Sequence, residues 1–252
     1  MVIVVVVVVV AVLTSACISL LGQVKLLAYL KKIDDLVRQE SPFPLPLLTS
    51  FSSSFIASSS SLKSCYQDTL FVLAQRQFYK LCYVYGTIDF IFGNAAVVFQ
   101  NCMILARKPL NGQANMITAQ GRGDPFQNTG ISIHNSRVMA APDLKPLVGS
   151  VQTFLGRPWQ EYSRTVYMKT FIDTHVNPQG WSPWGNTDFA FKTLYFGEYA
   201  CFGPGATTQN RVEWPGYHDI KTQSEASQFT VENLISGRGW LRATGIPFIV
   251  GL

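Results

Sequence analysis

Residues 78–84 read FYKLCYV, and this pattern returns as VFQNCMI at 98–104, SIHNSRV at 132–138 and VYMKTFI at 166–172. β-Branched and aromatic residues dominate these runs, and clusters of Gly, Asn, Asp and Pro separate them, which is typical of short strands. A strand that recurs in phase every few tens of residues predicts a solenoid. An all-β fold follows, because helical periodicity is poor throughout this part of the chain.

A parallel β-helix accommodates this repeat best, because each turn of chain then stacks on the previous turn. Neighbouring strands lie about 4.8 Å apart in such a stack. Residues that are distant in sequence but equal in phase then share one column, so Asp68, Asp89 and a residue near 157 can meet. A β-sandwich of short alternating strands is the competing interpretation of the same pattern.

Two carboxylates stand out in the stretch from Tyr66 to Asn94, YQDTLFVLAQRQFYKLCYVYGTIDFIFGN. Asp89 lies inside the apolar run GTIDFIFG of a chain that is only 14% charged. A strand here would direct Asp89 to the face opposite Ile88 and Phe90. Partnered carboxylates in apolar surroundings are frequent catalytic groups. The structural alternative is an aspartate that caps a turn after Gly86-Thr87.

The other candidate groups lie beside Asp68 and in LGRPW at residues 155–159. Gln67 adds a neutral donor that could stabilise an oxyanion next to a proton carrier. Arg157, set between Gly and Pro, could bind one carboxylate with its planar fork and keep it ionised. Trp159 offers a flat face for a sugar ring. The structural alternatives are a surface arginine and a core tryptophan. Serine-esterase chemistry is disfavoured because no G-x-S-x-G elbow occurs.

Composition limits the remaining classes of function. The 252 residues, 48% hydrophobic, predict one domain plus a leader. The net charge of +5 is spread without a basic run, which argues against nucleic-acid binding and suits an acidic polymer. No CxxC pair occurs and the three histidines are scattered, so a zinc site has no support. Cys82 and Cys102 share a phase in successive runs, within disulfide reach in the predicted stack.

Residues 1–64 predict a leader and a linker. Residues 1–22 are almost wholly apolar, which favours a secretory signal peptide cleaved before Cys17, with a membrane anchor as the alternative. Secretion would place the chain in an oxidising compartment. Within residues 23–64 we expect a short amphipathic helix at 23–40 and then a Pro- and Ser-rich linker. The β-helix domain would span residues 65–252.

Five ordered motifs resemble those of the plant pectin methylesterases (pectinesterases). They are YQDTL, GTIDFIFGNAAVVFQNC, TAQGRGDPFQNTGISI, LGRPWQEYSRTVYM and EYACFGPGA…RVEWPGYH, between about Tyr66 and the C-terminus. The family fold is a right-handed, single-stranded parallel β-helix, in agreement with the repeat. The resemblance implies an enzyme that removes methyl esters from pectin and releases methanol in the cell wall. It implies a monomer with no metal or organic cofactor, and a proteinaceous pectinesterase inhibitor as a second partner.

The resemblance also implies roles for individual residues. Asp89 would be the nucleophile, and Asp68 the general acid and then base. Gln67 would donate to the oxyanion, and Arg157 would hold Asp89 charged and aimed. Three aromatic side chains would line the sugar-binding groove: Phe92, Trp159 and Trp181.

The chain departs from the family pattern at its N-terminal side. Family members have several more coils before YQDTL, one of which carries a further glutamine of the oxyanion hole. Residues 1–64 resemble neither those coils nor the family's inhibitor-like pro-region, so we expect an N-terminally truncated or divergent coil stack. One missing oxyanion donor costs roughly 10²–10³ in rate. A catalytically silent or weak pectin-binding protein is therefore the alternative to an active esterase, and a glycosidase using both aspartates is a third hypothesis.

Overall fold

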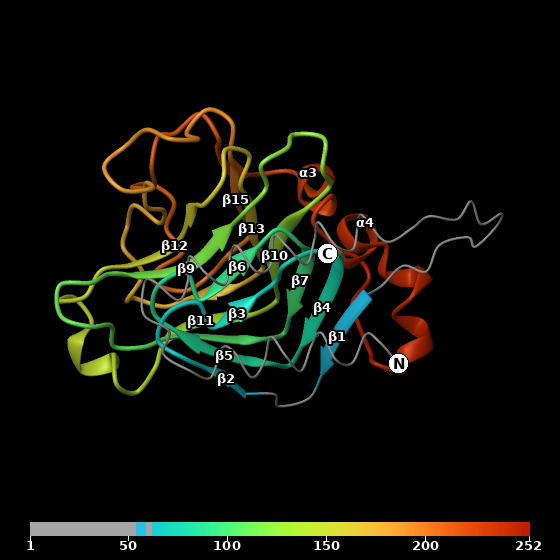
Figure 1. The fold of residues 1–252 in the computed structure, drawn as a ribbon, viewed down its shortest axis with the longest axis horizontal. Coiled ribbons are helices and arrows are strands. Elements are labelled where there is room, and N and C mark those ends of the chain that lie inside the picture. Colours follow the sequence, from blue (N-terminus) through green and yellow to red (C-terminus); the bar gives the residue numbers. More distant parts are fainter. Residues whose placement is uncertain (1–53, 59–61) are drawn as a thin grey trace, which may run out of the picture. The chain divides into compact units, whose positions relative to one another are not determined.

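Short parallel strands wind into a right-handed parallel β-helix with three sheets as its faces (Figure 1). The structure is a computed structural model that describes residues 54–58 and 62–252. The first sheet contains β1 (Ser54–Ser58), β4 (Arg76–Lys80), β7 (Ala96–Gln100), β10 (Gly130–His134), β13 (Arg164–Met168), β15 (Tyr195–Tyr199) and β16 (Tyr217–Ile220). The second contains β2 (Leu62–Ser64), β5 (Tyr83–Gly86), β8 (Met103–Ala106), β11 (Arg137–Ala140) and β14 (Phe171–Ile172). The third contains β3 (Leu70–Phe71), β6 (Ile91–Gly93), β9 (Asn115–Gln120) and β12 (Thr153–Pro158).

The register of the first sheet matches the repeat that the sequence predicts. Phe78 pairs with Val98, and Ser132 pairs with both Val98 and Val166. These are the first residues of the four aligned runs. Every strand pairing among the described residues is parallel, which confirms the β-helix over the sandwich.

The corner between the first and second sheets is built from left-handed residues. In the five coils from β4 to β15 the residue after the first-sheet strand has φ between 47° and 56°: Leu81, Asn101, Asn135, Lys169 and Ala200. Asn101 donates its N–H to the carbonyl of His134 at 3.1 Å, and Asn135 donates to Met168 at 3.0 Å. The corner thus satisfies its main-chain donors with the next coil, which offsets about 1–3 kcal/mol of backbone strain per residue.

Cys82 and Cys102 occupy the next position of this corner, together with Ser136 and Thr170 of later coils. The structure holds Cys102 as a thiol, so it does not form the predicted disulfide with Cys82. The Cys102 thiol instead donates to the carbonyl of Tyr79 at 3.5 Å, and its main-chain N–H donates to Ser136 Oγ at 3.0 Å. A hydrogen bond with Cys82, followed by burial, raises the pKa of Cys102 well above its ordinary value. The in-register stack therefore juxtaposes the two side chains as hydrogen-bonding neighbours.

The parallel sheets begin upstream of the predicted domain boundary at residue 65. β1 and β2 lie in the segment expected to be a serine-rich linker, yet they pair in parallel with β4 and β5. Main-chain hydrogen bonds to an existing edge do not depend on side-chain composition, which explains the difference. The predicted leader at 1–22 and helix at 23–40 lie outside the described residues. Among the helices that are described, none has the length and apolarity needed to cross a bilayer.

A large core inside the coil and two smaller cores outside its first sheet stabilise the stack. The larger core fills the interior of the coil with stacked aromatic and aliphatic side chains, including Tyr79 on Phe99 at 4.7 Å between ring centroids. The smaller cores lie outside the first sheet, beneath α3 (Gln223–Ser227), α4 (Val231–Ile235) and the 3₁₀ turns η2 (Gly237–Gly239) and η3 (Arg242–Thr244). A further 3₁₀ turn, η1 (Lys145–Leu147), follows β11. The C-terminal segment is held by Gln100, whose amide exchanges two hydrogen bonds with the main chain of Ile249.

A buried ion pair closes the far end of the interior. Arg211 binds both carboxylate oxygens of Glu198, at 2.8 and 2.9 Å, and both side chains are at most 2% exposed. Trp181 and Tyr217 donate to the same carboxylate from neighbouring segments. This network ties β15 to the segment that packs behind β12.

We expect Arg211→Met to lower the free energy of unfolding by about 3–5 kcal/mol, because it leaves the Glu198 carboxylate buried without a cation. Urea denaturation at neutral pH measures the loss. Arg238→Met is the matched control, because it breaks the exposed Arg238–Glu232 pair and should cost at most about 1 kcal/mol. Similar small losses in both variants would contradict a structural role for the buried pair.

Candidate active site

Asp68 and Asp89 occupy equivalent corners of adjacent coils. Leu70 and Phe71 of β3 pair with Ile91 and Phe92 of β6, so residues 21 positions apart are stacked. Asp68 donates its N–H to the carbonyl of Ile88 at 3.1 Å, in the same register.

Both aspartates adopt the left-handed conformation, with φ of 55° at Asp68 and 50° at Asp89. The expectation of a strand at Asp89 is wrong, since the residue lies in the bend before β6. Aspartate tolerates this conformation better than most residues. The bend directs the Asp89 carboxylate to Arg157 instead of capping the turn.

Arg157 holds Asp89 through two hydrogen bonds. Its Nε donates to Oδ1 at 2.9 Å and its Nη2 to Oδ2 at 2.7 Å, from β12 in the coil two turns beyond. The Asp89 side chain is 10% exposed and that of Arg157 23%. Gly156 permits the close approach of β12 to β9, because a Cβ there would lie 2.1 Å from Oγ1 of Thr118. A bidentate pair of this kind fixes the carboxylate in orientation as well as in charge.

The two carboxylates differ in electrostatic environment. Burial, and then the charge of Asp89, raise the pKa of Asp68 from 3.8 to about 6. The more distant charge of Arg157 and a hydrogen bond from Gln67 oppose that rise. Burial also raises the pKa of Asp89, but there the direct hydrogen bonds and the charge of Arg157 act against it. The direct contact with Arg157 therefore favours ionisation of Asp89 before Asp68, and Asp68 holds its proton below about pH 6.

Aromatic side chains surround the pair on the outer face of the third sheet. Phe71 stacks on Phe92 at 4.6 Å between centroids, and Trp159 meets Phe92 edge to face at 6.0 Å. All three rings are half-buried, so each presents a face or an edge to solvent. Phe92 and Trp159, both predicted to line a sugar-binding groove, thus contact each other on this partly exposed surface. Gln67 is exposed beside Asp68.

Trp181 does not lie on this surface, which corrects the sequence prediction. The residue is fully buried, stacks on Phe196 at 4.2 Å, and forms a β-bridge with Gly156 that directs its ring inward. The tryptophan that does reach the site is Trp184, whose ring lies 4.3 Å from the Arg157 guanidinium carbon. Trp184 was not among the predicted site residues, because the motif W-S-P-W at 181–184 does not indicate which of its two tryptophans faces the site.

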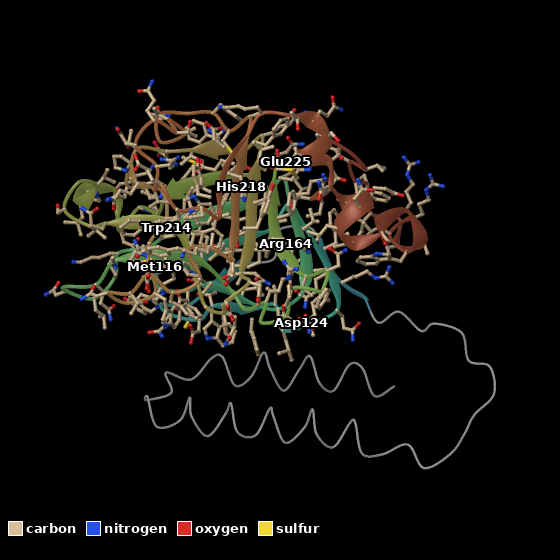
Figure 2. The ribbon with its side chains drawn as sticks, turned by 90° about the horizontal axis from the view of Figure 1, so that it is seen from above. Met116, Asp124, Arg164, Trp214, His218 and Glu225 are labelled. Atoms are coloured by element: carbon tan, nitrogen blue, oxygen red, sulfur yellow. The ribbon has the colours of Figure 1, made fainter. Side chains whose placement is uncertain are left out.

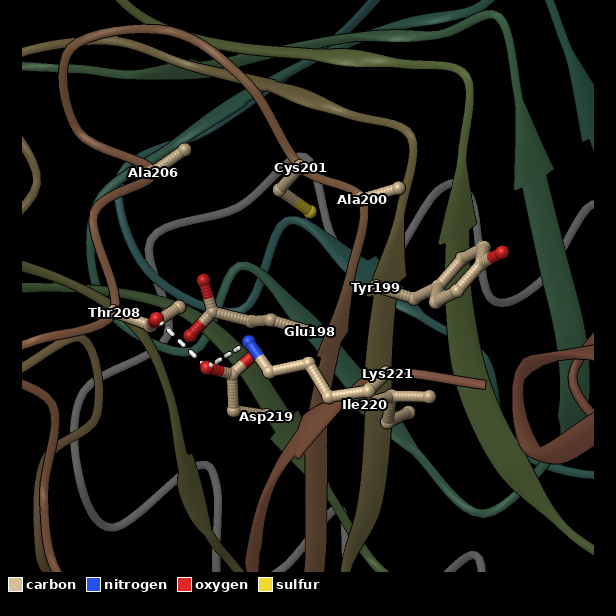
Figure 3. A pocket seen from close by; sticks show the side chains of 9 residues that line it. All are labelled: Glu198, Tyr199, Ala200, Cys201, Ala206, Thr208, Asp219, Ile220 and Lys221. Atoms are coloured by element: carbon tan, nitrogen blue, oxygen red, sulfur yellow. Dashed lines mark hydrogen bonds and ion pairs between the residues drawn. The ribbon is translucent and has the colours of Figure 1, made fainter. Parts of the chain in front are cut away.

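A cavity of about 410 Å³ lies elsewhere, at the end of the coil near β15 and β16 (Figure 3). Thr208 and Lys221 both donate to the Asp219 carboxylate in its wall, at 2.8 and 2.7 Å. None of the predicted site residues lines it; its walls are Glu198, Tyr199, Ala200, Cys201, Ala206, Thr208, Asp219, Ile220 and Lys221. Within the described part of the chain, no cluster of three or more His, Cys, Asp or Glu side chains is arranged to hold a metal ion.

This chain is similar to known proteins of one family. The family model described as Pectinesterase matches residues 50–238. "Probable pectinesterase/pectinesterase inhibitor 33" of Arabidopsis thaliana is 62% identical over 188 residues, which cover 74% of this chain and 32% of that protein. "Pectinesterase 2" of Citrus sinensis is 63% identical over 187 residues, with 74% and 36% covered. The chain thus spans about a third of the length of these curated relatives.

The fold is likewise similar to a solved structure, the pectin methylesterase from carrot. The TM-score is 0.74 at 53% sequence identity, and the match covers 76% of this chain and 60% of the carrot chain.

Because the pKa of Asp68 is raised in the folded protein, the free energy of unfolding should depend on pH through this residue. Folding favours its protonated form, so its contribution to stability is full below pH 3.8 and is lost as the pH rises through about 6. An asparagine cannot ionise. We therefore expect Asp68→Asn to raise the free energy of unfolding by about 1–2 kcal/mol at neutral pH, after allowing for partial solvent exposure, and to change it little at pH below 3.8.

Urea titrations at the two pH values measure this difference. Asp188→Asn, at an exposed position, is the control and should shift stability by no more than about 0.5 kcal/mol at either pH. Destabilisation by Asp68→Asn at neutral pH would show that the carboxylate is not strained by its surroundings.

Proposed function

The chain belongs to the pectinesterase family, and from this premise we propose that it is a carboxylic ester hydrolase that removes methyl esters from pectin and releases methanol. The observation that carries the proposal is the bidentate Arg157–Asp89 pair beside a carboxyl group with a raised pKa. Asp89 is held in one orientation by Arg157, and below about pH 6 its neighbour Asp68 holds a proton. This division suits nucleophilic attack on an ester followed by protonation of the leaving alkoxide.

In the first step, an Asp89 carboxylate oxygen attacks the carbonyl carbon of a methyl galacturonate unit. The two hydrogen bonds from Arg157 leave lone pairs on both oxygens for this attack. The developing oxyanion receives a hydrogen bond from the Gln67 amide, which in the free enzyme binds Asp68. Collapse of the intermediate breaks the bond to the methoxy oxygen. Asp68 donates its proton to that oxygen, and methanol leaves.

The second step hydrolyses the anhydride between Asp89 and the galacturonyl group. Asp68, now a carboxylate, accepts a proton from water as the water oxygen attacks the galacturonyl carbonyl carbon. The bond to the Asp89 oxygen breaks, which regenerates the Asp89 carboxylate and a free galacturonate acid. Asp68 ends protonated, as it began. A pKa of about 6 is suitable for a group that must both donate and accept a proton near that pH.

The surface around the pair suits a polysaccharide. We assign sugar contacts to Phe92 and Trp159, and we replace the predicted Trp181 by Trp184, because Trp184 covers Arg157. The chain carries a net charge of +5, which attracts a partly acidic polymer. A proteinaceous pectinesterase inhibitor that covers this surface is a further proposed partner.

We expect Asp89→Asn to reduce methanol release from highly methylated pectin by at least about 10³-fold, because the amide is a poor nucleophile. Thermal unfolding checks that the variant is folded. Asp188→Asn is the charge-matched control and should retain the wild-type rate. Equal release from wild type and Asp89→Asn would leave only pectin binding, and new reducing ends would indicate glycosidase chemistry instead.

We further propose that the protein is secreted to the cell wall, with residues 1–22 as a signal peptide. The support is the apolar composition of that segment and the small residues before Cys17. N-terminal sequencing of material from the culture medium should then begin at Cys17. An intact Met1 recovered in the membrane fraction would favour an anchor.

A further inference from the structure

The loop between β9 and β10, residues 121–129, carries an aromatic side chain that has no role in the proposed mechanism. Phe126 is 94% exposed, the largest exposed fraction among the large hydrophobic residues that the structure describes. Single exposed hydrophobic residues are common and need no explanation by themselves. This one differs in its position, its rigidity and its charged neighbours.

The loop is rooted against the proposed sugar-binding surface. Gly121 donates its N–H to the carbonyl of Gly93 at 2.8 Å, directly after Phe92. A Cβ at Gly121 would lie 2.7 Å from the ring of Trp159, so only glycine lets the chain pass the tryptophan this closely. Further along the loop, Gln127 accepts a hydrogen bond from the Asn94 side chain at 2.8 Å. Phe126 therefore lies one residue from a direct tie to the β6 end of the site.

Hydrogen bonds within the loop hold Phe126 in place. Its main-chain N–H donates to the Asp124 carboxylate at 2.9 Å, and the Arg122 guanidinium donates to the carbonyls of Asp124 and Pro125. The start of the loop is held by the side chain of Gln120, which is fully buried. Its Oε1 accepts the main-chain N–H groups of both Arg122 and Arg164, at 3.0 and 2.8 Å. An exposed aromatic ring on an ordered loop loses little conformational entropy when it binds a ligand.

Two arginines that hydrogen-bond to this loop lack an acidic partner in an ion pair. Among residues 64–252, no ion pair involves Arg122 or Arg164. The Arg164 guanidinium donates hydrogen bonds to the loop itself, to the carbonyl of Thr129 and to the side chain of Asn128. Burial, and then the charge of Arg122, lower the pKa of Arg164 to about 10. Burial lowers the pKa of Arg122, and the charge of Asp124 opposes that shift. Figure 2 shows Asp124 at the edge of the ribbon and Arg164 further in.

We propose that this loop forms a second sugar-binding platform, which takes a galacturonate unit that already has a free carboxylate. Phe126 stacks on the ring of that unit, and Arg122 binds its carboxylate, while an esterified unit of the same chain lies at Asp89. The inference rests on the proposed function, because only then do both sites bind one pectin chain. An aromatic face and a guanidinium that forms no ion pair together fit an acidic sugar better than a neutral methyl ester. The platform would direct the enzyme to esters that lie near units it has already hydrolysed.

Binding of unesterified polygalacturonate to the full chain, measured by isothermal titration calorimetry, tests the platform directly. We expect Phe126→Ala and Arg122→Gln each to weaken the Kd about five- to tenfold. Phe126→Tyr should stay close to wild type because it keeps the ring. The controls are Phe202→Ala and Arg242→Gln, which remove an exposed aromatic ring and an exposed arginine elsewhere and should leave the Kd unchanged.

Kinetics supply a second measurement. The ratio of kcat/KM on partly de-esterified pectin to kcat/KM on fully methylated pectin should fall several-fold in Arg122→Gln and stay constant in Arg242→Gln. An unchanged Kd in Phe126→Ala and Arg122→Gln would overturn the proposal. So would loss of binding to a proteinaceous inhibitor in Phe126→Ala with polygalacturonate binding intact. If the wild type releases no methanol but the Kd differences persist, the platform stands and the esterase function fails.

Discussion

The parallel register between successive coils is the constraint on which this structure depends. Each corner donates its main-chain N–H groups to the next coil, so a shift of one coil would leave a whole column of donors unsatisfied. Because residues 21 positions apart are stacked between β3 and β6, Asp68 must lie against Asp89. Two carboxylates in adjacent coils repel each other. The left-handed backbone at both positions exists only because the surrounding stack holds it.

Arg157 stabilises the negative charge of Asp89 directly, and it stabilises that of Asp68 less. Its two hydrogen bonds favour the charged form of Asp89, whereas Asp68 has only the Gln67 amide and a more distant cation. The same fold contains a second bidentate pair, Arg211 with Glu198, that is fully buried and whose carboxylate receives further donors from Trp181 and Tyr217. The comparison separates two uses of one interaction. The fully buried pair holds the coil together, whereas the partly exposed Arg157–Asp89 pair leaves carboxylate lone pairs open for chemistry.

The differences between expectation and structure have physical reasons. Trp181 and Trp184 are three residues apart, and sequence offered no way to decide which of them faces the site. The choice depends on the bridge between Trp181 and Gly156, which is a contact between coils separated by a long connection. Asp89 was expected in a strand because its neighbours are apolar, but the corner geometry of the coil overrides local pattern. The sequence of the loop at 121–129 shows no chemistry, because it does not indicate that Arg122, and Arg164 of β13, form no ion pair within residues 64–252.

Sequence alone determined the coil repeat, the register of the first sheet, the family, and four polar residues of the site, because stacking in phase turns a one-dimensional spacing into a column. It could not determine how side chains from coils of unequal length meet. Only the tertiary structure decided the bidentate geometry of Arg157 on Asp89, the position of Trp184 over that guanidinium, and the close passage of the 121–129 loop beside Trp159. Connections of different lengths break the repeat at those points, and packing sets the geometry there.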